Sequence, residues 1–351
     1  MNLIIKYNDA QRSLQHQKLS KPMQPVKFGV LGVSGFFTKK IVIPTAKSTL
    51  IQWAGIASRS LERSQKAAEI FNITQAYGSY EELLADESIE AVYIPLPNHV
   101  HAEWIKKVAD AGKHVLCEKP LALSAEEAQE AIEYAEAKGV KVMEAFMYRF
   151  HPQWQHVLEL IRMKEIGTVQ LVQTFFGYNN TDPSNIRNQS DKGGGALYDI
   201  GCYAVSASRF LLQAEPQRVL SLTTKHGDFK TDVLSSGTLD FGDARAQFTV
   251  ATQTFPYQRV MVHGSSGVIS IEIPFNTPAD VSAKVTVTTS VGTRVVELGA
   301  VDQYIVEFEA FARAIREDTA VPTASNDAVN NMRVLDGLLE SGRTGHWVSL
   351  Q

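Results

Sequence analysis

Three residues in two separate segments could together carry out proton transfer. Lys119 lies in the segment Cys117-Glu-Lys-Pro120, and Asp199 and Tyr203 follow a run of three glycines. In a helix, residues spaced like Asp199 and Tyr203 share one face. A phenol has a pKa of about 10, too high for easy proton exchange at neutral pH, and a nearby ammonium group would lower it. We therefore predict that Lys119, Asp199 and Tyr203 are catalytic and that Tyr203 exchanges a proton with the substrate.

Each of these residues also has a structural interpretation. A lysine in this segment could lie at the surface, an aspartate could cap a helix, and a tyrosine could pack in a core. The glycines from Gly193 to Gly195 favour a functional helix, because a glycine-rich segment is unusual directly before a helix that is merely structural. Pro120 can fix the backbone of Lys119, and a cis bond between the two residues is one way to do so.

The first part of the chain alternates short apolar runs with amphipathic stretches, which is typical of repeated βα units. The predicted strands are near-continuous in apolar and β-branched residues, as in a parallel sheet covered on both faces. Strands are predicted at 26–32, 50–58, 90–97, 113–120 and 140–146, and helices at 61–71, 101–112 and 124–139. Residues 26–150 are therefore predicted to form a Rossmann domain of the α/β class, with a doubly wound parallel sheet.

From residue 151 the pattern changes. Segments that alternate polar and apolar residues, joined by turns, indicate an antiparallel sheet with one face buried. Such segments span 168–178, 235–242, 244–252, 259–273 and 283–290, and helices are predicted at 152–164, 302–316 and 326–340. Residues 151–351 are therefore predicted to form an α+β domain with a large, mostly antiparallel open sheet, whose last helices could pack back on the first domain.

The turn after the first strand is rich in small residues. Gly32, Ser34 and Gly35 let the backbone turn sharply and approach a diphosphate at the start of the next helix. The match to G-x-G-x-x-G is incomplete, because a register from Gly32 places Ser34 and Phe37 where glycines are expected. A plain strand-to-helix turn is the alternative. Cofactor contacts are predicted here for Gly32, Ser34, Gly35 and Phe36.

The end of the second strand indicates which dinucleotide is bound. Enzymes that use NAD usually place an acid there to hold the ribose 2′-hydroxyl, and this chain has none. Instead, Ser58 and Arg59 stand at the strand end, and Arg63 follows one helical turn later. A hydroxyl and guanidinium groups suit a 2′-phosphate, so we predict NADP(H) in preference to NAD(H). A solvated arginine at the start of a helix is the alternative for Arg59.

Further residues are predicted to line the same cleft. Because an open α/β sheet binds its ligand at the carboxyl ends of its strands, we expect the segments after the fourth and fifth strands to meet the nicotinamide. Cofactor contacts are predicted for Pro95, Leu96, Asn98, His101, Glu118 and Lys119. Substrate contacts are predicted for Lys119, Tyr148, Arg149, Asp199 and Tyr203. No metal site is expected at His99 and His101, because no carboxylate or thiolate pattern accompanies them.

Composition excludes several classes of protein. The net charge of -4 comes with scattered lysines and arginines, so neither nucleic acid nor a membrane is an expected partner. No apolar run reaches the roughly 18 residues that a membrane helix needs. The two cysteines, Cys117 and Cys202, are too few for a disulfide framework, and we interpret them as packing residues of a cytoplasmic protein. Residues 1–25 do not read as a signal peptide, and we expect a loose polar arm or one that lies on a neighbouring subunit.

Together these features resemble the Gfo/Idh/MocA oxidoreductase family. The resemblance rests on the βα repeat, on Glu118-Lys119-Pro120 after the fifth strand, and on Asp199 and Tyr203 behind the triple glycine. It covers residue 26 to the C-terminus and implies an α+β domain whose open sheet forms a homodimer or a homotetramer. It also implies that Lys119 is the catalytic lysine, that Tyr203 is the proton donor, and that Asp199 orients the substrate and the lysine.

The resemblance further indicates the reaction. Many family members have histidine at the position of Tyr203, and tyrosine there is similar to the branch that acts on sugars and cyclic diols. The expected activity is NADP-dependent hydride transfer to or from a secondary alcohol or carbonyl of such a ring, as in an aldose 1-dehydrogenase. One alternative is reduction of a nucleotide-linked keto sugar, for which Arg187 and Lys192 are the only evident cations near 168–190. Another is a non-catalytic NADP-binding regulator. Phe37 departs from the small residue usual in the family's cofactor loop.

Overall fold

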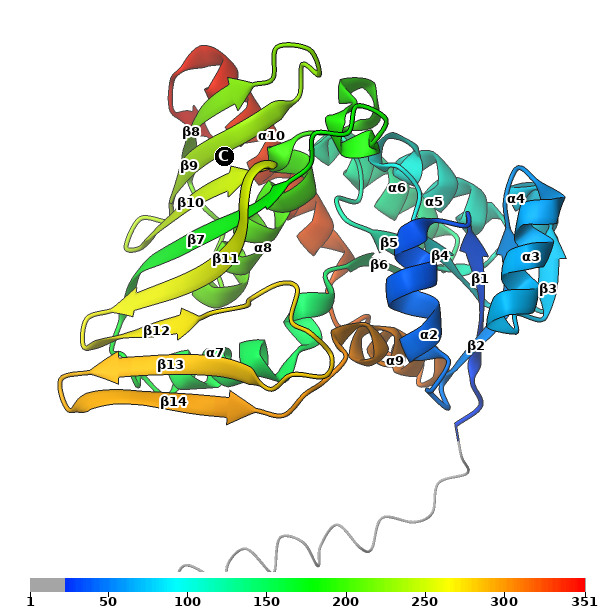
Figure 1. Cartoon of the computed structure of the whole chain (residues 1–351), viewed down its shortest axis with the longest axis horizontal. Helices are drawn as coiled ribbons and strands as arrows, with labels where there is room; N and C mark the ends of the chain where they lie inside the picture. The colour runs from blue at the N-terminus through cyan, green and yellow to red at the C-terminus, as the bar shows by residue number, and fades with distance from the viewer. Residues whose placement is uncertain (1–22, 351) are drawn as a thin grey trace, which may run out of the picture.

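The computed structural model describes residues 23–350, which form two β-sheets lying side by side with helices packed against each (Figure 1). Most of the arm predicted for residues 1–25 lies outside the described residues. No helix in the described range is long and apolar enough to cross a membrane. The fold is of the predicted mixed α/β class, with a Rossmann-type sheet followed by a mostly antiparallel one.

The first sheet has six parallel strands in the order β3-β2-β1-β4-β5-β6. This is the strand order of the dinucleotide-binding Rossmann fold. The strands are β1 (Val26–Leu31), β2 (Ile51–Ala57), β3 (Gln75–Tyr77), β4 (Ala91–Ile94), β5 (His114–Glu118) and β6 (Val142–Ala145). The central strands β1 and β4 are almost wholly buried because helices cover both faces. The predicted doubly wound sheet is confirmed, and the short edge strand β3 is an addition to it.

The helices of this half begin close to the carboxyl ends of the strands. The side chains of Ser60, Ser79 and Ser124 accept hydrogen bonds from amides in the first turns of three helices, which pairs donors that a helix leaves unsatisfied. These helices are α3 (Leu61–Phe71), α4 (Tyr80–Leu84) and α6 (Ala125–Ala137). A π-helical turn, η2 (Phe37–Ile41), leads into α2 (Val42–Thr45), and a 3-10 turn, η3 (Asn98–Val100), leads into α5 (His101–Asp110).

The second sheet has nine strands in the order β14-β13-β12-β11-β7-β10-β9-β8-β15. Every neighbouring pair is antiparallel except β7 and β10. The strands are β7 (Val169–Asn179), β8 (Arg218–Lys225), β9 (Asp232–Asp240), β10 (Arg245–Ala251), β11 (Gln253–Gly264), β12 (Gly267–Ile271), β13 (Ala283–Thr289), β14 (Gly292–Leu298) and β15 (Val348–Ser349). The predicted large, mostly antiparallel sheet is therefore confirmed.

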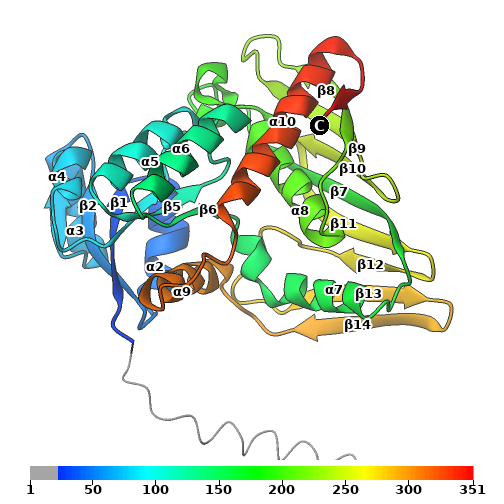
Figure 2. The ribbon, with the colours of Figure 1, turned by 180° about the vertical axis from the view of Figure 1, so that it is seen from behind.

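Helices cover one face of the second sheet and leave the other open (Figures 1 and 2). The covering helices are α7 (Pro152–Arg162), α8 (Cys202–Leu212) and α10 (Ser325–Thr344). Helix α9 (Gln303–Arg316) instead packs against the first sheet, where Phe308 meets Phe28 and Trp53. The chain thus returns to the Rossmann half before α10 brings it back to the second sheet.

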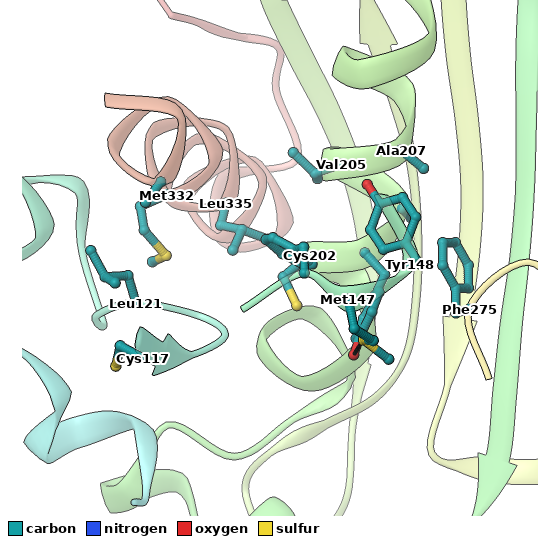
Figure 3. Close-up of a cluster of buried hydrophobic side chains, with 14 of the residues drawn as sticks. Cys117, Leu121, Met147, Tyr148, Cys202, Val205, Ala207, Phe275, Met332 and Leu335 are labelled. Carbon is teal, nitrogen blue, oxygen red and sulfur yellow. Dashed lines mark hydrogen bonds between the residues drawn. The ribbon is translucent and has the colours of Figure 1, made fainter. Parts of the chain in front are cut away.

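The hydrophobic core continues across the junction of the two sheets (Figure 3). Tyr148, from the 3-10 turn η4 (Met147–Phe150), packs edge-on against Phe275 with ring centroids 5.4 Å apart. Cys117 of β5 and Cys202 of α8 lie in the same core as free, buried thiols. Because this core joins the two halves, it fixes the side chains that reach from one half to the other.

Candidate active site

A cleft of about 1200 Å³ lies between the two sheets. On one side it is bounded by the carboxyl ends of β1, β4 and β5, where α/β proteins bind their ligands. On the other side lie the ends of β7 and β11 and the segment that leads to α8. The cleft brings together most of the predicted site residues: Ser34, Gly35, Phe36, Pro95, Leu96, Asn98, Glu118, Lys119, Asp199 and Tyr203.

Lys119 reaches across the cleft from the end of β5. Its bond to Pro120 is cis. Its Nζ donates to the backbone oxygen of Asp199 at 2.8 Å and lies 3.3 Å from Oδ1 of the same residue. The two side chains are only 11% and 12% exposed. Burial opposes the charge on Lys119 most strongly, but Asp199, together with Cys202 and Glu118, raises the pKa of the lysine above its ordinary value. The ammonium form is therefore the resting form.

Asp199 is the centre of a buried polar cluster. It lies in a π-helical turn, η7 (Leu197–Gly201), that leads into α8. Such turns are rare and often mark functional sites. Its Oδ2 accepts hydrogen bonds from the hydroxyl of Tyr178 at 2.6 Å and from Nε of Arg187 at 3.0 Å. Burial alone would raise the pKa of Asp199, but Arg187 and Lys119 lower it well below its usual range. The carboxylate is therefore ionised and balanced by two cations.

Tyr203 presents its ring to Lys119. Nζ of the lysine is 4.9 Å from the ring centroid, a cation–π distance, while the hydroxyl donates to Sδ of Met147 at 3.5 Å. Burial raises the pKa of Tyr203 well above 10. The lowered pKa expected from the lysine is therefore wrong, because burial of the phenol dominates. Tyr203 is a neutral donor whose thioether partner is a weak acceptor, so that a substrate oxygen can replace it.

The floor of the cleft beside Lys119 is also built from polar and aromatic groups. The hydroxyl of Tyr93 donates to Oε1 of Glu118, and burial raises the pKa of Glu118. Tyr304, from α9, lines the cleft and meets the ring of Phe36 edge-on, with centroids 5.8 Å apart. A helix from the end of the chain thus completes the side of the cleft formed by the loop after β1.

The loop after β1 has the geometry of a phosphate cradle. Gly32 has a φ of +99°, a conformation open mainly to glycine. The hydroxyl of Ser34 accepts from the amide of Phe37 and caps the following turn. A Cβ at Gly35 would meet no atom within 4 Å, so the space beside it is open. The ring of Phe37 is turned into the core against Trp53, 4.9 Å away, and leaves the loop clear.

The end of β2 lies beside this loop. Nη2 of Arg63 donates to the backbone oxygen of Val33 at 2.6 Å. Arg59 is exposed. Burial raises the pKa of Tyr80 while Arg59 and Arg63 oppose that rise, so both guanidinium groups act at this edge of the loop. Ser58 was predicted to contact the cofactor. Its side chain is instead buried, and its hydroxyl donates to a backbone oxygen of its own turn, which it supports.

His101 does not reach the cleft, contrary to the prediction. Its ring is fully buried, with Nδ1 at 2.9 Å from the backbone oxygen of Pro120 and Nε2 at 2.8 Å from that of Leu96. Burial lowers the pKa of His101 to about 4. The residue ties together two loops that do line the cleft, and we correct its role from cofactor contact to loop support.

Tyr148 and Arg149 also lie behind the cleft, so the predicted substrate contacts are wrong. The hydroxyl of Tyr148 shares a hydrogen bond with Ser206 at 2.6 Å, and Nη2 of Arg149 donates to the same Ser206 oxygen at 2.6 Å. Nη1 of Arg149 is 2.8 Å from a carboxylate oxygen of Asp327 on α10. The polar ends of both side chains are therefore used inside the core.

Two members of the site were not among the predicted residues. Tyr178 lies at the end of β7, and Arg187 lies in a 3-10 turn, η5 (Ile186–Asn188), within an irregular segment. Tyr178 looks like one more aromatic of an alternating strand. The one signal for Arg187 was its charge, which stands shortly before the triple glycine.

Comparison with known proteins identifies the family. Residues 26–146 match the model of the GFO_IDH_MocA oxidoreductase family with an NAD-binding Rossmann fold, and residues 154–270 match the GFO/IDH/MocA C-terminal domain. The chain is 40% identical to D-xylose 1-dehydrogenase (NADP(+)) 2 of Haloferax volcanii, over 92% of this chain and 99% of the relative. It is 38% identical to an uncharacterized oxidoreductase of Rhizobium meliloti, over 93% and 99% of the two chains.

Solved structures agree. A 3-ketoreductase from Actinomadura kijaniata, in complex with NADP and TDP-benzene, matches with a TM-score of 0.86 at 29% identity, over 91% of this chain and 98% of that one. Variants of that ketoreductase carry substitutions at one lysine or at one tyrosine, and these two positions are as far apart in sequence as Lys119 and Tyr203. Both family models match this chain, and the similarity to its relatives extends over nearly the full length of each. The chain therefore belongs to the Gfo/Idh/MocA family of oxidoreductases.

Proposed function

We propose that this protein is an NADP-dependent oxidoreductase that transfers hydride between nicotinamide and a secondary alcohol or carbonyl group of a sugar or cyclic diol. The family and the xylose dehydrogenase relative support the reaction type and the cofactor. The observation that carries the proposal is the reach of Lys119 from the dinucleotide side of the cleft to Asp199 and Tyr203 on the opposite side.

The residues of the cleft fit this cofactor. Gly32, Ser34 and Gly35 would hold the diphosphate, because the positive φ of Gly32 and the open space at Gly35 let it approach the backbone. Arg59 and Arg63 would hold the 2′-phosphate through charge-assisted hydrogen bonds. When bound, NADP(H) supplies or accepts the hydride.

The groups of the chain itself control the proton and the charge on the reacting oxygen. In the direction of reduction, the hydroxyl of Tyr203 leaves the sulfur of Met147, forms a hydrogen bond to the substrate carbonyl oxygen and gives this oxygen a proton. The ammonium group of Lys119 stabilises the negative charge that develops on that oxygen. The same ammonium group then lies beside the phenolate of Tyr203 until solvent returns a proton to this residue. In the direction of oxidation Tyr203 first gives its proton to solvent, and the phenolate beside Lys119 then takes the proton of the substrate hydroxyl. Asp199 keeps Lys119 charged and in place.

Tyr203→Phe tests the proposal. We expect kcat for NADP reduction with D-xylose or D-glucose to fall by about 100-fold or more, because general acid-base catalysis contributes at least that much. The affinity for NADPH, measured by fluorescence titration, should stay unchanged, since the ring remains. Turnover close to that of the unmodified enzyme would show that Tyr203 does not exchange the proton.

A second candidate is reduction of a keto group on a nucleotide-linked sugar. One observation favours it: Arg187 and Lys192 both line the cleft and could meet a diphosphate, and the solved ketoreductase holds a TDP ligand. A substrate panel that contains aldoses, cyclic diols and a TDP-linked keto sugar separates the two by their kcat/KM. If the chain binds NADPH and turns over nothing in the panel, a non-catalytic regulator becomes the better description.

The open face of the nine-stranded sheet is the proposed contact between subunits of a homodimer or a homotetramer. A hollow of about 990 Å³ on this face is lined by apolar as well as polar side chains, and Leu222 there is 78% exposed. Tyr257, in the same lining, is 46% exposed, and exposed apolar side chains that gather on one face often mark an interaction site. The two free, buried thiols fit the cytoplasm as the proposed location.

A further inference from the structure

The carboxylate of Asp199 is held by more than the lysine. Oδ1 faces Lys119, and Oδ2 accepts from Tyr178 and Arg187. Among the described residues, Asp199 thus pairs with one group from the Rossmann half and two from its own half. The two oxygens point to different partners, so the carboxylate cannot rotate without breaking at least one hydrogen bond to a buried group.

The triple glycine fixes Arg187 from behind. The amide of Gly195 donates to the backbone oxygen of Arg187 at 2.9 Å. A Cβ at Gly194 would lie 2.6 Å from that same oxygen, and a Cβ at Gly195 would lie 2.0 Å from Oδ1 of Asp232. Neither position can carry a side chain without moving backbone or a buried carboxylate. The glycines that precede the helix of Asp199 therefore also position the residue that pairs with it.

Arg187 is suited to hold an anion in place. Its planar guanidinium donates through Nε to Asp199, and its side chain is 41% exposed on the wall of the cleft. Arg187 and Lys119 both lower the pKa of the Asp199 carboxyl, and the charge of Arg187 contributes more than the charge of Lys119. Asp199 in turn raises the pKa of Arg187. The neutral Tyr178 adds a short hydrogen bond without adding charge.

We propose that Arg187, assisted by Tyr178, is a positioning residue of the reacting site that fixes the Asp199 carboxylate against Lys119. The inference deepens the proposed function and rests on it, since it takes Lys119 and Asp199 as reacting groups. The three charged groups then lie along the cleft in the order Lys119, Asp199, Arg187. Arg187 keeps the carboxylate of Asp199 ionised, and this carboxylate keeps the amine of Lys119 protonated and directed at the substrate.

The first experiment does not depend on any substrate. In protein labelled with ¹³C-aspartate, the carboxyl signal of Asp199 is assigned with Asp199→Asn and titrated in wild type and in Arg187→Gln. We expect the midpoint to rise by about 1 to 3 pH units in Arg187→Gln, because a partner charge is lost. Lys192→Gln removes the same charge from the same segment and should leave the midpoint unchanged, since Lys192 makes no hydrogen bond to Asp199 in the described structure.

The second experiment separates positioning from substrate binding. With D-xylose and NADP, Arg187→Gln should lower kcat by about 10- to 100-fold, as for a misplaced catalytic group, with a much smaller change in KM, and Arg187→Lys should restore part of the loss. Tyr178→Phe should lower kcat less than Arg187→Gln does, and it should also raise the Asp199 midpoint less. If Arg187→Gln does not fold, Tyr178→Phe still tests the proposal.

Each outcome decides the matter. An unchanged Asp199 midpoint in both Arg187→Gln and Tyr178→Phe overturns the proposal, and so does a rise in KM at constant kcat, which would make Arg187 a substrate-binding residue. If wild type oxidises no aldose or cyclic diol, the proposed function fails, while the titration alone still accepts or rejects the role of Arg187.

Discussion

The reacting end of the cleft and the end of β2, which lies beside the loop after β1, hold their charges in opposite ways. At the reacting end, Lys119 and Asp199 are nearly buried and already paired with each other. At the end of β2, Arg59 is exposed, and Arg63 bonds to the protein through one backbone oxygen. A group that meets charge as it develops must be oriented and desolvated beforehand. A group that meets a permanent phosphate can stay solvated until the phosphate arrives. The comparison predicts that substitutions at the two ends will affect different measurements.

The largest effect is expected at Lys119. Lys119→Met keeps most of the side-chain volume but removes the ammonium group, so kcat should fall by about 1000-fold, while the Kd for NADPH changes little. Steady-state kinetics combined with fluorescence titration measures both. Lys106→Met, which removes a half-buried lysine of α5 that pairs with an exposed glutamate, serves as the control and should match wild type. A loss of NADPH binding equal to the loss of turnover would erase the contrast between the two ends.

A smaller and opposite effect is expected at Arg59. Arg59→Ala should weaken NADPH binding by about 10- to 100-fold, the value of one or two charge-assisted hydrogen bonds, and should leave NADH binding and kcat at saturating NADP nearly unchanged. Titrations with the two reduced cofactors test this, and Arg162→Ala on α7, also exposed, is the control. If NADPH and NADH lost affinity equally, Arg59 would not read the 2′-phosphate.

Much of the fold could be predicted because both sheets leave periodic patterns. Continuous apolar runs gave the parallel strands, and alternating runs gave five segments of the second sheet. The strands that escaped prediction are mostly short or exposed. β3 and β15 have three and two residues, β14 is mostly exposed along its length, and half of the eight residues of β8 are exposed. The sequence allows the last helices to pack back on the first domain. Which of them does so, α9, and against which side chains depends on tertiary contacts that no local pattern encodes.

The site was predictable where a residue stands at a strand end or in a motif, as with Lys119 and Asp199. It was not predictable where the deciding fact is burial. Arg149 and His101 are polar residues next to the cleft, and residue type alone does not tell whether a polar group faces a ligand or a buried partner. Arg187 was not predicted as a residue of the site, because it lies in an irregular segment where no periodic pattern indicates which way a side chain faces.

The smallest predicted effect concerns a carboxyl group behind the reacting end that contrasts with Asp199. Glu144 is buried; one of its oxygens accepts from the amide of Leu121 at 2.8 Å, and the other has no partner among the described residues. Burial, and then the nearby Asp327, raises the pKa of Glu144 to about 7. Asp199 has two cations at hand and is ionised, whereas Glu144 is neutral until the pH rises.

This difference predicts a pH dependence of stability. Because the folded-state pKa of Glu144 is above its ordinary value, the stability it contributes is complete at low pH and is lost as the pH rises through 7. Between about pH 6 and about pH 8 the loss amounts to about 1 kcal/mol. Glu144→Gln keeps an acceptor for Leu121 and cannot ionise, so its free energy of unfolding should fall less over this interval, as measured by urea titration at both pH values. Glu159→Gln, an exposed carboxylate on α7, should behave like wild type, and equal pH dependence in all three proteins would mean that Glu144 is ionised throughout.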